Sequence, residues 1–167
     1  MSSKIPYELS PYPPSQTALL FLDYQNYLVN MVPSPTNESL CNAVKTLLAT
    51  ARETTSPKVV AAWGTQYKPL LSANPQLGLD TNRETVHMRK PGLRSVLEPE
   101  VVAYLRERLG VNHSILAGII ATSGAVMGTT SHGTDINFVI SVVPEACCGP
   151  SAETHDDLIN IVIPTLA

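Results

Sequence analysis

A carboxylate at the end of an apolar segment is the first group in this sequence that could do chemistry. Asp23 ends the apolar part of TALLFLDYQ, which begins at Thr17. Burial at a strand end removes water from a carboxylate, which raises its pKa and suits it to general acid–base catalysis. Such a carboxylate can equally cap or brace the next loop. Position alone therefore leaves both a catalytic and a structural role open for Asp23.

A lysine is the second candidate. Lys90 stands in VHMRKPGL, directly after a candidate strand. Its ammonium could pair with Asp23 or hold an anionic group of a substrate. Arg89 and Arg94 are alternative cations for the same role. A lysine in a turn before a proline can also be an ordinary solvated side chain, so both readings of Lys90 stay open.

A segment of small residues, AGIIATSGAVMGTT, is the third candidate, and it begins at Ala117. It lies where a predicted strand meets a predicted helix, so its backbone N–H groups could bind an oxyanion or a carboxylate. Ser123 is a weak candidate nucleophile, because a serine before a helix is more often an N-cap and the G-x-S-x-G pattern is absent.

Metal and cofactor chemistry find no support in the residue spacing. No H-E-x-x-H or Asp-x-His pattern accompanies the histidines, and no phosphate loop or dinucleotide fingerprint is present. We therefore predict no metal site and no cofactor. Cys147 and Cys148 end a predicted strand at the ligand-binding edge, so one of them could face a pocket, although a buried structural cysteine is the commoner case.

Strands and helices alternate along the chain. Short apolar segments predict strands over residues 17–25, 58–64, 84–90, 113–120 and 137–146, and amphipathic segments predict helices over residues 37–54, 98–110, 122–137 and 152–163. This alternation predicts a three-layer α/β fold, a doubly wound and mainly parallel sheet with helices on both faces. Ligands bind at the carboxyl ends of such strands, where Asp23, Lys90 and residues 121–125 would meet.

The length of 167 residues fits a single domain. Residues 1–16 contain four prolines and are predicted to form an arm that wraps over the domain or packs on a neighbour, with the domain itself over residues 17–167. Residues 65–83 are polar and contain a proline. They predict a long connection that is either a lid or binding loop or a plain surface excursion.

Charge and composition narrow the partners. The net charge is −3 and no basic cluster exceeds a pair, so we predict binding to neither nucleic acid nor an anionic membrane. No segment approaches the ~20 apolar residues of a membrane span, and no apolar run follows the N-terminal lysine as in a secretory signal. Three cysteines, two of them adjacent, argue against a disulfide framework, which favours the cytoplasm.

Taken in order, these segments resemble the isochorismatase-like (cysteine hydrolase) superfamily over residues 17–164. TALLFLDYQ resembles the first strand of that family with its catalytic Asp-x-Gln, at Asp23 and Gln25. The family lysine corresponds to Lys90. LAGIIATSGAVMGTT resembles the signature G-I-x-T-x-x-C-V-x-x-T, in which Ala125 stands at the position of the nucleophilic cysteine.

The resemblance also implies roles for these residues. In the family the cysteine attacks an amide or similar carbonyl, the aspartate is its base and the lysine orients the pair. The N–H groups of Ala121 and Ala125 would form the oxyanion hole, next to a cis peptide bond between Ile120 and Ala121. The catalytic positions are then Asp23, Lys90 and Ala125, and the positions that bind substrate or oxyanion are Gln25, Ile120, Ala121, Thr122, Ser123 and Gly124.

Alanine cannot act as a nucleophile, and loss of a nucleophile costs a factor on the order of a million in kcat. Three explanations stay open. Isochorismatases proper also lack the cysteine and cleave a vinyl ether by protonation and water attack, for which Asp23 would suffice. The chain could instead be a catalytically silent member that binds a ligand or partner, or an engineered Cys-to-Ala variant of an amidohydrolase.

The resemblance further implies a small-molecule substrate and a homo-oligomer, a dimer or tetramer. The nicotinamidase branch of the family carries a metal-binding Asp-x-His after its second strand. This chain has WGTQYKPL in that region, which argues against a metal and against nicotinamide as the substrate.

Overall fold

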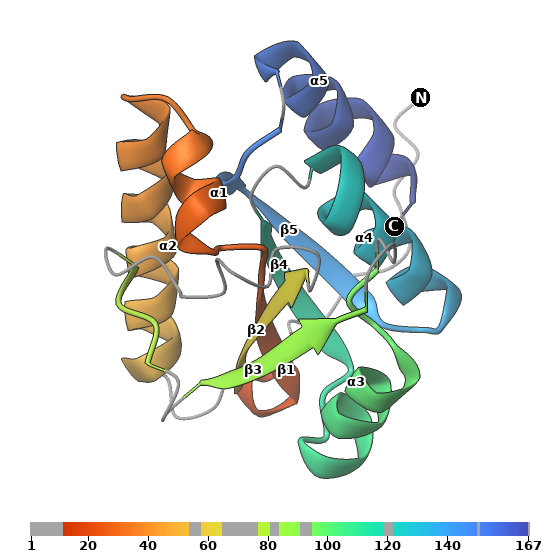
Figure 1. Cartoon of the computed structure of the whole chain (residues 1–167). Coiled ribbons are helices and arrows are strands. Elements are labelled where there is room, and N and C mark those ends of the chain that lie inside the picture. The colour runs from red at the N-terminus through yellow and green to blue at the C-terminus, as the bar shows by residue number, and fades with distance from the viewer. Residues whose placement is uncertain are drawn as a thin grey trace.

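The computed structural model describes residues 12–53, 58–64, 77–80, 84–90, 95–118, 122–149 and 151–166. Within them, one five-stranded sheet has the order β3-β2-β1-β4-β5, and every neighbouring pair is parallel (Figure 1). The strands are β1 (Thr17–Leu22), β2 (Lys58–Gly64), β3 (Thr85–Arg89), β4 (His113–Gly118) and β5 (Val139–Cys147).

The central strand, β1, is buried along its whole length, as its continuous apolar sequence requires. Because side chains alternate between the faces of a strand, β1 contributes to both apolar cores. Ala18, Leu20 and Leu22 pack in the core that includes residues of the chain after position 95. Leu19 and Phe21 pack in the other core, with helix α2. The sheet is therefore covered on both faces, and the predicted three-layer, doubly wound fold is confirmed.

Helices α1 (Asn26–Met31) and α2 (Thr36–Glu53) cover one face of the sheet, and α3 (Pro99–Ala103), α4 (Met127–Asp135) and α5 (Ala152–Asp157) lie on the other side (Figure 1). The apolar stripe of α2 consists of its buried residues Leu40, Cys41, Val44, Leu48 and Ala51. Such a stripe holds a helix against a sheet. None of the helices in the described ranges is both long and apolar enough to cross a membrane.

Two elements differ from the sequence-based expectation. Helix α1 was not predicted, since its six residues are too few to show helical periodicity. The last predicted strand began at Asn137, but that residue has a φ of 62° and lies in the turn after α4, so β5 begins at Val139. Asparagine is one of the few residues that adopt this left-handed conformation readily.

Several expectations concern residues that lie outside the described part of the chain. They include most of the proline-rich arm, since only residues 12–16 are described, and most of the connection over residues 65–83, since only residues 77–80 are described. The division into an arm and a domain stays a prediction.

Strand order decides where a ligand site can form. The chain adds β2 and β3 on one side of β1 and then returns to add β4 and β5 on the other side. The direction of winding therefore reverses between β1 and β4. In sheets of this kind the crevice at the carboxyl ends of those two strands is the usual ligand site.

Candidate active site

Asp23 lies at this crevice, directly after β1. Its side chain is buried, with 6% of its surface exposed, and its backbone has a φ of 60°. Aspartate, like asparagine, adopts this left-handed conformation more readily than most residues other than glycine, so it suits a tight turn after the strand. Gln25 is wholly buried and is the N-cap residue directly before α1, and its backbone carbonyl accepts a hydrogen bond from the Val29 N–H. The predicted Asp-x-Gln pair therefore occupies a tightly built turn.

The segment after β4 forms the other side of the crevice. Leu22 at the end of β1 pairs with Gly118 at the end of β4, which brings the residues that follow each strand to the same edge. The backbone of Thr122–Val126 forms a π-helical turn that leads into α4. Ala125 belongs to this turn, and its methyl group is 4% exposed within the same apolar core as Leu20 and Leu22.

Gly124 is half-buried, and a Cβ atom added there would have no atom within 4 Å. Open space over a glycine beside Ala125 fits a surface that a ligand can approach. Ile120 and Ala121 lie outside the described residues, so the predicted cis peptide bond and the predicted oxyanion hole stay predictions. Of Thr122 and Ser123, the structure describes the backbone turn alone.

Lys90 follows β3, which is separated from β1 by β2. Its ammonium lies 3.1 Å from Glu98 Oε2 and 3.3 Å from Glu100 Oε1, and its backbone N–H donates to Glu98 Oε1 at 2.9 Å. The hydrogen bond to Glu98 is the largest of the causes that raise the pKa of Lys90. The structure thus brings Lys90 to two glutamates at the end of β3.

Glu98 is a buried carboxylate that sequence reasoning missed. Burial by itself raises its pKa, but the hydrogen bonds and charge of Lys90, with a smaller contribution from His87, lower that pKa overall. His87 Nε2 lies 3.6 Å from Glu98 Oε1. In the sequence, Glu98 stands out only as an acidic residue directly before Pro99. That position predicts the start of a helix and gives no indication that the carboxylate is buried. A pocket of about 170 Å³ adjoins this cluster and is lined by Lys90, Ser95, Leu97, Glu98, Pro99 and His132.

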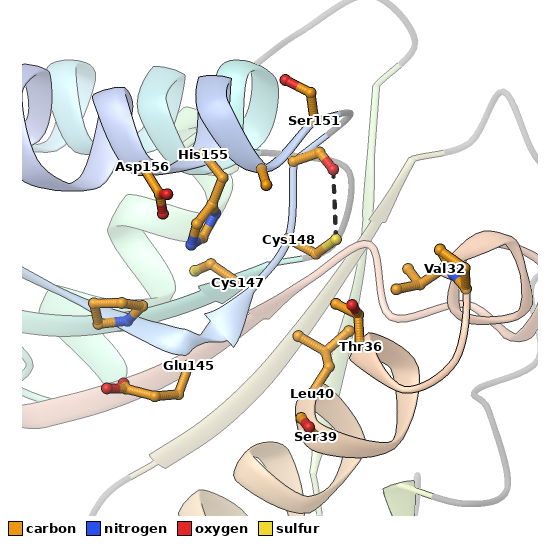
Figure 2. Close-up of a pocket in the computed structure, with 14 residues that line it drawn as sticks. Val32, Thr36, Ser39, Leu40, Glu145, Cys147, Cys148, Ser151, His155 and Asp156 are labelled. Atoms are coloured by element: carbon orange, nitrogen blue, oxygen red, sulfur yellow. Dashed lines mark hydrogen bonds between the residues drawn. The ribbon is translucent and has the colours of Figure 1, made fainter.

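The ends of β1 and β5 are tied together by Tyr24. This residue is fully buried, and its hydroxyl donates a hydrogen bond to the Ala146 carbonyl. Burial raises the pKa of Tyr24 well above its usual value. A second pocket, of about 470 Å³, lies at the carboxyl end of β5 (Figure 2). Cys147 and Cys148 both line it, whereas the sequence left open only that one of them faces a pocket, and Cys147 is also buried.

Burial raises the pKa of the Cys147 thiol to about 12, and it also raises the pKa of Cys148. Both thiols are therefore protonated near neutral pH, and neither has the thiolate character of a nucleophile. Among the described residues, no three His, Cys, Asp or Glu side chains are grouped so that they could hold a metal ion. Residues 65–70, on which the argument against a metal depended, lie outside those residues.

The fold and the crevice define a doubly wound α/β protein with a buried aspartate at its switch point. The model of the isochorismatase domain family matches residues 17–167, and the chain belongs to this family. No curated protein sequence matches the chain.

Solved structures share the fold. An isochorismatase family protein from Burkholderia thailandensis is 21% identical, with a TM-score of 0.78 over 92% of this chain and 90% of that one. The YcaC gene product from Escherichia coli, described as an octameric hydrolase of unknown specificity, is 20% identical, with a TM-score of 0.77 over 95% of this chain and 77% of that one. A pyrazinamidase/nicotinamidase from Streptococcus mutans is 18% identical, with a TM-score of 0.70 over 90% and 97%.

Proposed function

We propose that this protein is a hydrolase of a small metabolite that works without a covalent intermediate. The observation that carries the proposal is the buried carboxylate of Asp23, which lies at the switch point of the sheet. Ala125 has a methyl group where the resemblance implies a nucleophilic cysteine, so a proton-transfer mechanism accounts for the residues better than acyl transfer does.

Cleavage of a vinyl ether is the most concrete form of this reaction. Asp23 in its acid form donates a proton to the terminal carbon of the double bond, which leaves an oxocarbenium ion. A water molecule adds to the oxocarbenium carbon and returns one proton to Asp23. The resulting hemiketal then breaks its C–O bond to release a carbonyl compound and an alcohol. The protons balance, and the aspartate is regenerated for the next turnover.

The proposal gives supporting roles to the other site residues. The side chain of Lys90 is 61% exposed, so an anionic group of a substrate can approach it. Glu98 and Glu100 offset part of its charge. For this reason we assign Lys90 to substrate binding and Asp23 to the chemical step. Gln25, Gly124 and the N–H groups near Ala121 and Ala125 complete the proposed binding surface.

The test compares the unmodified chain with Asp23→Asn. Each is incubated with isochorismate, simple vinyl ethers and small amides, and the products are followed by mass spectrometry. We expect vinyl-ether turnover by the unmodified chain and a loss of at least about a thousandfold in Asp23→Asn, since asparagine cannot donate the proton. Asp135→Asn, an exposed residue at the end of α4, is the matched control and should retain full activity.

Two results would overturn the proposal. Activity retained in a folded Asp23→Asn variant would remove Asp23 from the chemistry. Absence of turnover by the unmodified chain on every substrate would favour the second candidate, a catalytically silent member of the family that binds a small ligand. The observation behind that candidate is the buried methyl group of Ala125, which cannot attack a carbonyl.

We further propose that the protein is a homo-oligomer in the cytoplasm. The description of the Escherichia coli neighbour as an octamer supports the oligomer. The three free thiols, Cys41, Cys147 and Cys148, support a reducing compartment. Light scattering coupled to size-exclusion chromatography measures the number of subunits, and a monomer at micromolar concentration would contradict the first of these proposals.

A further inference from the structure

The pocket at the end of β5 is built from two stretches of the chain that are distant in sequence, residues 32–40 and residues 144–156. Its walls are the turn between α1 and α2, the first turns of α2, the end of β5 and the start of α5 (Figure 2). The lining residues are Val32, Pro33, Thr36, Ser39, Leu40, Pro144, Glu145, Cys147, Cys148, Gly149, Ser151, Ala152, His155 and Asp156. Its volume of about 470 Å³ falls in the range of small-molecule sites. Asp23, Lys90 and Ala125 are not among these residues.

A local irregularity of β5 shapes one wall. Leu116 pairs with Val142, so a regular ladder would pair Gly118 with Pro144. Gly118 pairs instead with Cys147, because proline has no N–H group to donate. The strand therefore bulges over residues 143–146. The bulge lies on the pocket side of the strand end and carries Glu145 to the exposed rim.

The inner part of the pocket is apolar. Val32, Leu40 and Cys147 are each buried, and all three line the cavity. The thiols of Cys147 and Cys148 stay protonated near neutral pH because burial raises both pKa values. Cys148 also donates a hydrogen bond to the Gly149 carbonyl, at 3.5 Å (Figure 2). The apolar part of a ligand would therefore contact only uncharged atoms on the inner wall of the pocket.

The rim of the pocket is acidic. Glu145 and Asp156 are exposed lining residues on β5 and α5, and neither Lys nor Arg occurs among the fourteen described lining residues. Figure 2 shows His155 and Asp156 extending from α5 toward the end of β5. Two carboxylates at the rim of an apolar cavity attract a cation and repel an anion.

We propose that this pocket binds a small organic ammonium ion with an apolar body. The apolar body packs against Val32, Leu40 and Cys147, and the ammonium group lies at the rim, near Asp156 and Glu145. This proposal does not rest on the reaction proposed at Asp23, since Asp23, Lys90 and Ala125 do not line this pocket.

The test uses three probes of the same shape and different charge. 2-Phenylethylammonium, 2-phenylethanol and phenylacetate are titrated into the full chain, and binding is followed by ¹H–¹⁵N NMR. We expect the ammonium probe to bind with a Kd on the order of 1 mM, which is ordinary for a ligand of this size. The largest shifts should fall in residues 32–40, 144–149 and 151–156. Phenylacetate should bind at least about tenfold more weakly.

Variants then separate the charge from the cavity. Glu145→Gln combined with Asp156→Asn should weaken the ammonium probe by about tenfold, since each exposed carboxylate contributes modestly. Ala152→Phe should fill the cavity and abolish binding of all three probes. Glu153→Gln is the matched control, because Glu153 is an exposed carboxylate on the same helix that does not line the pocket, and it should leave binding unchanged.

The outcomes are distinguishable from those of the proposed reaction. Asp23→Asn should leave the Kd of the ammonium probe unchanged, even if it abolishes turnover. Equal affinity for the ammonium and the carboxylate probes would contradict the role of Glu145 and Asp156. Shifts that persist in a folded Ala152→Phe variant, or shifts that are absent at 20-fold probe excess, would show that the pocket is not the binding site.

Discussion

At the scale of single residues, the proposed mechanism depends on Ala125. Its methyl group is buried in the apolar core that also contains Cys147, whose thiol has a pKa of about 12. A thiol introduced at residue 125 would share part of that environment and would stay largely protonated. We therefore expect Ala125→Cys to raise amide hydrolysis by less than about tenfold, measured with a panel of small amides. A gain of several orders of magnitude would show a cysteine hydrolase that had lost its nucleophile.

Tyr24 is a second residue with a measurable role. Its buried hydroxyl donates to the Ala146 carbonyl, so Tyr24→Phe leaves that carbonyl without its donor. We expect the free energy of unfolding, measured by urea denaturation, to fall by about 1–3 kcal/mol. Tyr27→Phe is the matched control, because Tyr27 is 43% exposed, and it should change that free energy by less than about 0.5 kcal/mol. Equal effects of the two variants would contradict a structural role for the Tyr24 hydroxyl.

At the scale of elements, Glu98 connects the end of β3 with the start of α3. The carboxylate accepts the Lys90 N–H and lies 3.1 Å from the Lys90 ammonium. We expect Glu98→Gln to lower the free energy of unfolding by about 1 kcal/mol, since the amide still accepts the N–H bond but loses the ion pair. Urea denaturation at pH 7 measures this change. Glu100→Gln, at the exposed partner, should have little effect.

The pKa of Glu98 also sets a pH range for this contribution. Its folded-state pKa is lowered from 4.5, so its stabilising effect is present above pH 4.5 and is lost as the pH falls through the lower folded value. The difference in stability between the unmodified chain and Glu98→Gln should therefore shrink as the pH falls below 4.5. A difference that stays constant with pH would assign the effect to packing.

At the scale of the whole molecule, His113 joins three strands at the amino end of the sheet. Its two ring nitrogens lie 3.2 Å from the Thr17 hydroxyl on β1 and 2.9 Å from the Ser141 hydroxyl on β5. Burial lowers the pKa of His113 from 6.5, so below that pH the unfolded chain binds more protons than the folded one. The free energy of unfolding should therefore fall as the pH decreases below 6.5.

His113→Asn tests that prediction. The variant removes the titrating group, so its stability should change less than that of the unmodified chain between pH 7.5 and pH 5, by urea denaturation. This range lies above the titration of Glu98, which keeps the two effects apart. If the free energy of unfolding depends on pH in the same way in both proteins, the titration of His113 does not contribute to stability. His132→Asn is the matched histidine control.

How much of the fold followed from sequence is clearest at β1. Its unbroken apolar segment predicted a strand buried on both faces of a parallel sheet, and Asp23 at its end was predicted to stand at the ligand-binding edge. Helix α1 escaped prediction because six residues give no periodicity. The burial of Glu98 and its pairing with Lys90 were not predicted, because the sequence does not distinguish a solvated carboxylate before Pro99 from a buried one.

The sequence by itself determined the α/β class, the buried first strand with its terminal aspartate, and the alanine at residue 125, since each depends on residue type and local order. The tertiary structure alone decided the strand order, the pairing of Lys90 with Glu98, and the pocket between α2 and α5. The strand order and the pocket join segments that lie far apart along the chain, such as Leu40 and His155, whereas Lys90 and Glu98 are only eight residues apart and are brought together by the local path of the folded chain. Contacts of that kind depend on packing in three dimensions, which local periodicity does not encode.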